Sequence, residues 1–133
     1  MPSQADKAAA FRALHERPGA FVIPNPWDAG TARLLAGLGF EALATTSLGL
    51  ANMLGRPFSK VTRAEVIENT RVIAEATDLP VSVDLENCFA HEPKPAAEAI
   101  RLASEAGAVG GSIEDFTGDP RTRSTTSSLR WRG

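Results

Sequence analysis

The sequence predicts an α/β fold in which parallel strands alternate with helices. Short apolar runs recur along the chain, and each is followed by a segment with apolar residues at helical spacing. Each repeated unit spans roughly 20–40 residues, the size of a βαβ crossover. Strands that are apolar at nearly every position are typical of a parallel sheet covered by helices. A doubly wound sheet and a barrel both satisfy this pattern.

The first expected elements are a helix, a strand and a second helix. Gln4–Glu16 has an apolar face at helical spacing and is ended by a Pro-Gly pair at Gly19. The apolar run 20–23 predicts a buried strand, closed by two prolines. Asp28 is the expected N-cap of the next helix, because its carboxylate can accept an otherwise unpaired backbone N–H. That helix stops at Gly39.

The same rhythm continues through the middle of the chain. A strand is expected over 40–45 and a loop over 47–60, where two glycines and a proline fall. Thr62 and Glu65 form a capping-box pattern that starts a helix running to about residue 76. The remaining expected elements are a strand over 79–84, a loop over 86–93, a helix over 94–106 and a strand over 108–113.

Composition excludes several classes of function. The chain has 133 residues and a formal net charge of -2, which offers no basic surface for nucleic acid or an anionic membrane. The N-terminus lacks the apolar core of a secretory signal, and no apolar run is long enough to span a bilayer. Cys88 is the only cysteine, so no internal disulfide is possible. We expect a cytoplasmic protein.

The C-terminal segment 121–133 differs from the rest of the chain. It contains four arginines, no acidic residue and no periodicity. One interpretation is a disordered basic tail. The favoured interpretation is a frameshift, because shifting the reading frame by one base from Thr122 can restore a plausible helix start. We therefore divide the chain into a half-barrel over 1–120 and a non-native or disordered tail over 121–133.

Polar side chains follow the expected strands at their carboxyl ends, where ligands bind in parallel α/β folds. Asp84 and Glu86 follow the third strand, and alternation along the strand predicts that both carboxylates share one face. Glu114 follows the next strand. Three carboxylates suit Mg²⁺ or Mn²⁺, which prefer oxygen ligands. The alternative is a set of helix caps and solvated loop acids.

Two other features have a simpler alternative. The hydroxyls and backbone N–H groups of 45–47 could hold a carboxylate or phosphate, or could merely begin a polar loop. Cys88 could be a nucleophile, but no histidine is evidently paired with it, so a small buried packing residue is the better interpretation. We expect Trp27 to pack at the exit of the first strand.

Four motifs, in order, give the chain a resemblance to a known family, over about Lys7 to Pro120. The motifs are Phe21-Val22-Ile23-Pro24-Asn25-Pro26-Trp27-Asp28-Ala29, Ala44-Thr45-Thr46-Ser47, Leu79-Pro80-Val81-Ser82-Val83-Asp84-Leu85-Glu86-Asn87 and Gly110-Gly111-Ser112-Ile113-Glu114-Asp115. With these motifs the chain resembles the isocitrate lyase/phosphoenolpyruvate mutase family.

The resemblance implies a (β/α)8 barrel of the TIM type, of which this chain supplies the first four strands. It implies Mg²⁺ or Mn²⁺ beneath an α-oxo carboxylate substrate, with C–C or P–C bonds broken or formed through an enolate-like intermediate. By this likeness Asp84 is the direct metal ligand, and Glu86 and Glu114 hold metal-bound waters. Thr46 and Ser47 hold the substrate carboxylate, largely through backbone N–H groups.

The chain departs from the family pattern at three places. Phe58 stands where the family usually has an acidic residue that helps to hold the metal waters. Cys88 follows Glu86-Asn87 where relatives have a glycine, whose backbone angles cysteine adopts only at a cost. Residues 116–120 replace the lysine- and cysteine-containing gating loop of the lyases, which puts isocitrate or methylisocitrate cleavage in doubt.

Three hypotheses follow. The first is a fragment of a metal-dependent lyase, mutase or hydrolase, inactive alone. The second is a non-catalytic half-barrel stabilised as a homo-oligomer, since the outer strands of a half-barrel are open edges that favour association. The third is an unrelated barrel enzyme, which needs a Schiff-base lysine or a phosphate loop; no lysine follows an expected strand.

Overall fold

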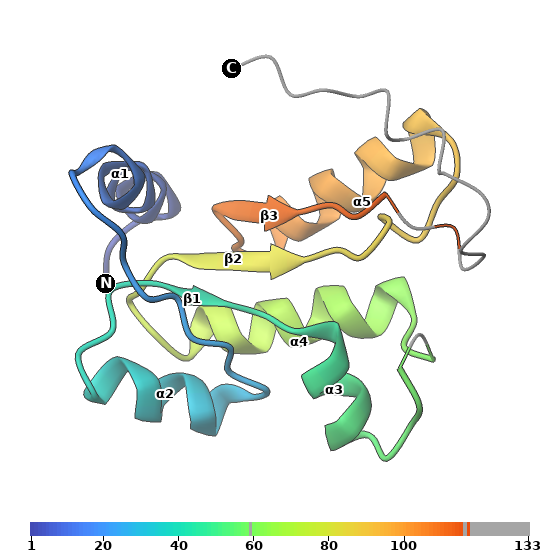
Figure 1. Cartoon of the computed structure of the whole chain (residues 1–133), viewed down its shortest axis with the longest axis horizontal. Helices are drawn as coiled ribbons and strands as arrows, with labels where there is room; N and C mark the ends of the chain where they lie inside the picture. The colour runs from blue at the N-terminus through green and yellow to red at the C-terminus, as the bar shows by residue number, and fades with distance from the viewer. Residues whose placement is uncertain (59, 116, 118–133) are drawn as a thin grey trace.

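The computed structural model describes residues 1–58, 60–115 and 117. Three parallel strands, β1 (Leu43–Ala44), β2 (Val81–Asp84) and β3 (Gly110–Ser112), form a sheet in the order β1-β2-β3. Figure 1 shows the three strands running in the same direction, so that their carboxyl ends lie at one edge. The register pairs Leu43 with Val81 and Asp84 with Ser112.

The helices of the chain separate and flank these strands. They are α1 (Gln4–Glu16), α2 (Ala29–Gly37), α3 (Ser47–Met53), α4 (Arg63–Glu75) and α5 (Pro93–Glu105). Helix α4 contacts α2, α3, α5 and strand β2, so it lies at the centre of the helical layer. No helix in the described part of the chain is long and apolar enough to cross a membrane.

The core lies between one face of the sheet and these helices. Leu43 and Val81 pack with residues of α2 and α4, while Val83 and Leu85 pack with residues of α3, α4 and α5. These four side chains all have odd numbers, and the even-numbered Ser82 and Asp84 stay partly exposed. A one-sided cover of this kind is that of a barrel wall rather than a doubly wound sheet, which carries helices on both faces.

Helix α1 closes the amino end of the strands (Figure 1). Lys7 donates from Nζ to the carbonyls of Ala74 and Thr77, at 3.2 and 2.7 Å, near the end of α4. Gln4 donates to the carbonyls of Ser104 and Ala108, at 2.7 and 3.0 Å, near the end of α5. Carbonyl groups at helix C-termini lack intrahelical partners, so α1 satisfies groups that its neighbours leave open.

Several sequence predictions are confirmed residue by residue. Helix α1 has the predicted bounds, and Asp28 caps α2 by accepting from the N–H of Thr31 at 2.7 Å. The capping box of Thr62 and Glu65 is present at the start of α4. The predicted strands over 40–45, 79–84 and 108–113 are present but shorter.

Two predictions are wrong. The run 20–23 is not a strand: Pro24 accepts one backbone bond from Ala44 at 3.1 Å, and prolines 24 and 26 have no N–H to donate to a ladder. The segment after β1 is not simply a loop, because it begins with helix α3. Thr46 caps that helix by accepting from the N–H of Gly49 at 3.2 Å. The predicted tail over 121–133 lies outside the described residues.

Candidate active site at the carboxyl edge of the sheet

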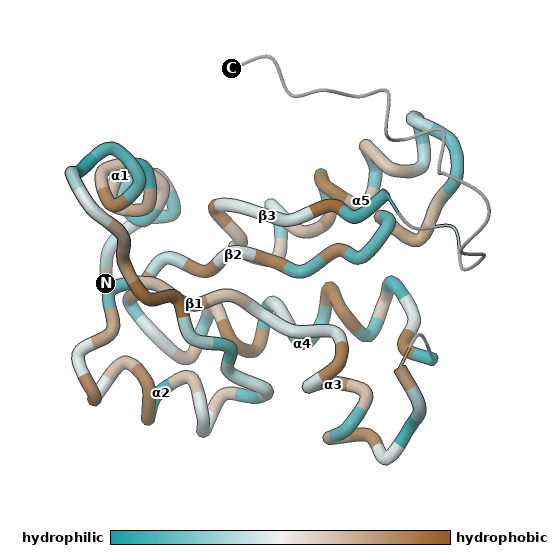
Figure 2. Tube along the Cα trace, in the orientation of Figure 1, coloured by the Kyte–Doolittle hydropathy of each residue, from teal (hydrophilic) through white to brown (hydrophobic). Residues whose placement is uncertain are grey.

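The candidate site is built from segments that leave the three strands at the same edge. Ser47 follows β1, Asp84 ends β2 and Glu114 follows β3. Figure 2 shows hydrophilic positions beginning where β2 and β3 end, beyond the apolar stretch of β2. Parallel pairing alone therefore brings residues from distant parts of the sequence together.

Asp84 is held at both its backbone and its side chain. Its backbone N–H donates to Oγ1 of Thr45 at 2.9 Å. Its Oδ2 accepts from the backbone N–H of Ser47 at 2.9 Å and from the Ser47 hydroxyl at 2.8 Å. Its Oδ1 accepts from the backbone N–H of Glu86 at 3.0 Å. Three donors to one carboxylate restrict its rotation.

Glu86 is the buried member of the site, with 9% of its surface exposed. Burial raises the pKa of its carboxyl group; hydrogen bonding with the Ser47 side chain lowers it, and the nearby charges of Asp84 and Glu114 raise it further. Its Oε1 is buried with no hydrogen-bond partner among the described residues. A buried carboxylate oxygen without a donor is costly, so this position calls for a proton, a water or a cation.

The loop after β2 positions Glu86 through an unusual backbone. Glu86, Cys88 and Phe89 have φ values of 49°, 61° and 53°, in the left-handed region. Such residues cost of order 1–3 kcal/mol each and persist only where their surroundings hold them. The loop is held by Cys88 N–H to the Leu85 carbonyl at 2.7 Å and by Glu114 N–H to the Glu86 carbonyl at 2.6 Å.

This backbone corrects the predicted route to the site. Leu85 points into the core, as alternation predicted, with 2% of its surface exposed. The strand ends at Asp84, however, and Glu86 reaches the neighbourhood of Asp84 through its left-handed conformation rather than through continued pleating. Strand periodicity cannot be extended past a residue with positive φ.

The carboxylates do not form a ready-made cage of direct ligands. Within residues 1–58, 60–115 and 117, no three Asp, Glu, His or Cys side chains group as the ligands of one metal ion. Glu114 is exposed, whereas Glu86 is buried and Asp84 is intermediate. Mg²⁺ is commonly bound by one or two carboxylates and several waters, a mode that needs no three-residue cage.

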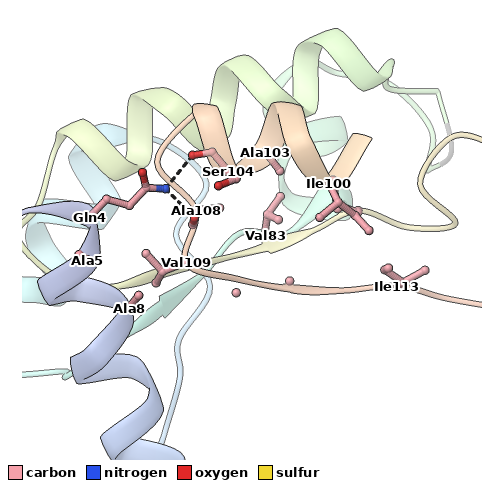
Figure 3. Close-up of a pocket in the computed structure, with 13 residues that line it drawn as sticks. Gln4, Ala5, Ala8, Val83, Ile100, Ala103, Ser104, Ala108, Val109 and Ile113 are labelled. Atoms are coloured by element: carbon pink, nitrogen blue, oxygen red, sulfur yellow. Dashed lines mark hydrogen bonds between the residues drawn. The ribbon is translucent and has the colours of Figure 1, made fainter. Parts of the chain in front are cut away.

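A cavity of about 490 Å³ lies elsewhere, between α1, β3 and α5. Figure 3 shows Gln4, Ala5 and Ala8 on one side and Ile100, Ala103 and Ser104 on another. Its lining includes no titratable side chain and none of the candidate site residues. We therefore place the chemistry at the carboxylate edge, where charge and hydrogen-bonding groups converge, rather than in this apolar cavity.

Comparison with known proteins gives the family of the chain. The sequence model of the phosphoenolpyruvate phosphomutase family matches residues 11–130. The chain belongs to this family. Its members include lyases and mutases, so the resemblance described above is confirmed at the level of the family.

Individual relatives are lyases and mutases as well. The chain is 31% identical to a 2,3-dimethylmalate lyase of Eubacterium barkeri over 110 residues, which is 81% of the chain and 38% of that protein. A crystal structure of a candidate lyase/mutase from Burkholderia cenocepacia J2315 has 61% identity and a TM-score of 0.88, over 90% of the chain and 43% of that structure.

A phosphonopyruvate hydrolase solved with oxalate and Mg²⁺ shares the fold, with a TM-score of 0.80 and 21% identity, over 84% of the chain and 39% of that structure. The chain spans less than half the length of each of these three proteins. The fold is accordingly that of the TIM-barrel type, represented here by three parallel strands and their helices.

Other residues singled out from the sequence have structural roles. Cys88 is fully buried, and burial raises the pKa of its thiol, which makes it a poor nucleophile. The Trp27 ring packs over Gly49: a Cβ atom added there would lie 2.5 Å from the ring. Phe58 is exposed.

The sequence reasoning missed that Thr45 and Ser47 hold Asp84. Both are predicted only as part of a group that could hold a carboxylate or phosphate. The signal that could have revealed the contact is the parallel order of the strands, which places the residues after β1 beside the end of β2. The assignment of Thr46 and Ser47 to the substrate stays a prediction.

Proposed function

We propose that this chain carries the metal-binding edge of an enzyme that breaks or forms a C–C or P–C bond next to an α-oxo carboxylate, through an enolate-like intermediate. The observation that carries the proposal is the orphaned, buried Oε1 of Glu86 beside Asp84 and Glu114. Neighbouring carboxylates repel one another, and a cation or a proton between them relieves the repulsion.

The residues present suit Mg²⁺ or Mn²⁺. The donors are carboxylate and hydroxyl oxygens, which these hard cations prefer to sulfur or imidazole. In this proposal Asp84 binds the cation directly, and Glu86 and Glu114 hold its waters. When bound, the cation would supply positive charge beside the oxyanion that develops on the substrate.

The chain's own groups would orient the reactants. Thr46 caps α3 and Ser47 is its first residue, and the N–H of Ser47 donates to Asp84 at the sheet edge. We assign the carboxylate of the substrate to this turn, because N–H groups at the start of a helix favour anions. The identity of the oxo acid, the cytoplasmic location and the homo-oligomeric state remain predictions.

Metal binding by the chain itself tests the proposal. Mn²⁺ is titrated calorimetrically into the parent chain, Asp84→Asn and the matched control Asp78→Asn. Asp78 is an exposed residue before β2, at the opposite end of that strand, and undergoes the same change in charge. We expect one Mn²⁺ site in the parent and the control, and a loss of about tenfold or more in affinity for Asp84→Asn.

Melting temperature distinguishes the proposed metal-binding enzyme from the non-catalytic half-barrel. A chain that binds Mg²⁺ in its folded state melts at a higher temperature when the ion is added, by an amount that grows with concentration above Kd. A stable dimer whose melting temperature does not respond to Mg²⁺ or Mn²⁺ would instead support the non-catalytic half-barrel. Oxaloacetate and phosphonopyruvate cleavage is measured separately, and we expect this chain alone to show little turnover.

A further inference from the structure

Ser47 directs both of its hydrogen-bond donors to a single oxygen. It is the first residue of α3, and its side chain is buried, with 4% of the residue exposed. Its N–H and its hydroxyl both donate to Oδ2 of Asp84, at 2.9 and 2.8 Å. The two residues are 37 positions apart in the sequence, so this contact belongs to the tertiary fold rather than to a local turn.

The two carboxylate oxygens of Asp84 accept different numbers of hydrogen bonds. An ionised carboxylate has about four acceptor positions, two on each oxygen. The two donors of Ser47 occupy Oδ2, and the N–H of Glu86 occupies one position of Oδ1. The remaining acceptor position is therefore on Oδ1. A carboxylate held in this way can give one oxygen to a cation without losing an existing hydrogen bond.

The hydroxyl of Ser47 has no other structural duty that explains it. Thr46 already caps α3, since its Oγ1 accepts from the N–H of Gly49 at 3.2 Å. An alanine at position 47 would keep the backbone N–H bond to Asp84 and suit the first turn of a helix.

We infer that the Ser47 hydroxyl is a positioning group for Asp84, which it holds so that Oδ1 is presented to a divalent cation. The inference rests on the proposed function, because it concerns the same carboxylate edge. It assigns both donors of Ser47, the hydroxyl and the N–H, to the acid that binds the metal. Groups that orient a metal ligand typically contribute 10–100-fold to metal affinity.

The test is Mn²⁺ titration of the 133-residue chain without any substrate analogue. We expect Ser47→Ala to raise the Kd for Mn²⁺ by about tenfold or more. Ser47→Thr keeps the hydroxyl and should bind within about threefold of the parent. Ser104→Ala, a serine change in an exposed part of α5, is the control and should leave the Kd unchanged. Circular dichroism and melting temperature verify that each variant is folded.

Each outcome supports or overturns the inference. A Kd for Ser47→Ala within about twofold of the parent overturns it. An equal loss in Ser47→Ala and Ser47→Thr also overturns it, because packing at position 47, and not the hydroxyl, would then govern affinity. If the parent itself binds no Mn²⁺, the proposed function fails. If the parent binds and Ser47→Ala binds equally well, only the inference about Ser47 fails.

Discussion

Glu114 donates its backbone N–H to the carbonyl oxygen of Glu86 across 2.6 Å. This bond joins the segments that leave β2 and β3, beyond the last paired residues of the sheet. It also holds a residue with positive φ in place, so the acid with the orphaned Oε1 is positioned by the neighbouring strand. The electrostatics of the site therefore depend on the backbone as much as on side chains.

The raised pKa of Glu86 predicts that Glu86→Gln changes the melting temperature of the metal-free chain by an amount that depends on pH. Burial favours the neutral acid, so its pKa in the folded chain lies above the ordinary value of 4.5. The stability that the neutral acid contributes is present below pH 4.5 and is lost as pH rises through the folded-state pKa. Glutamine stays neutral, so Glu86→Gln should melt above the parent at pH 7.5 and show no such gain at pH 4.

The control for this experiment is Glu16→Gln, an exposed glutamate at the end of α1. Its change in melting temperature should be small and similar at both pH values. Chelator is present throughout, since a bound cation would stabilise ionised Glu86. A Glu86→Gln gain that is as large at pH 4 as at pH 7.5 would contradict the account of a buried, destabilised carboxylate.

The positive φ of Cys88 predicts that glycine at this position is no less stable than alanine, although glycine usually destabilises a buried site. Cys88→Ala removes a fully buried thiol and keeps a Cβ in the left-handed region. Cys88→Gly removes more volume but relieves backbone strain of about 1–2 kcal/mol. We expect glycine to be at least as stable as alanine at this position in urea denaturation. The control is the buried Ala99 of α5, where the backbone is helical. Ala99→Gly should lower the free energy of unfolding by about 1 kcal/mol or more.

The contact between Trp27 and Gly49 predicts that any side chain larger than glycine at position 49 clashes with the Trp27 ring. A Cβ at position 49 would lie 2.5 Å from the Trp27 ring and 2.6 Å from the Thr46 side chain. Gly49→Ala should therefore destabilise the chain by about 1–3 kcal/mol, although alanine favours a helix. Gly37→Ala, at the end of α2 with nothing within 4 Å, should be neutral or stabilising. Equal effects of the two changes on denaturant midpoints would refute the steric explanation.

The bond from Asp84 N–H to Thr45 predicts that Thr45→Val is destabilising. Valine has nearly the same shape but cannot accept, so a backbone N–H at the end of β2 loses its partner at a cost of about 1–3 kcal/mol. The matched control is Thr70→Val in α4. The Thr70 hydroxyl donates to the carbonyl of Val66, and helix carbonyls have backbone partners, so its loss should cost less than about 1 kcal/mol.

Much of the fold follows from local sequence signals. Capping residues such as Asp28 and Thr62 act on N–H groups two or three positions away, so their effect can be read from neighbouring residues. The prediction of a strand over 20–23 is wrong because an apolar run resembles a strand whether or not another strand pairs with it. Gly49 suggested a loop, whereas it is a close-packed helix position whose reason, Trp27, is remote in sequence.

The site could be predicted only in part. That its acids lie at one edge can be predicted, because parallel strands direct the polar residues that follow them to the same edge. The attachment of Ser47 to Asp84 and the orphaned oxygen of Glu86 depend on strand register and on left-handed backbone angles. Neither is encoded by spacing. Three carboxylates in sequence therefore indicate a cation site without showing how each is held.

The parallel order β1-β2-β3 also has a consequence for how quickly the site is made. Each pairing must wait until an intervening helical segment has folded back, and contacts of such long sequence separation slow the search for the native state. Ser47 and Asp84 meet only after β1 and β2 have aligned. We therefore expect their contact to form after the folding transition state, so that Ser47→Ala accelerates unfolding and leaves the folding rate nearly unchanged.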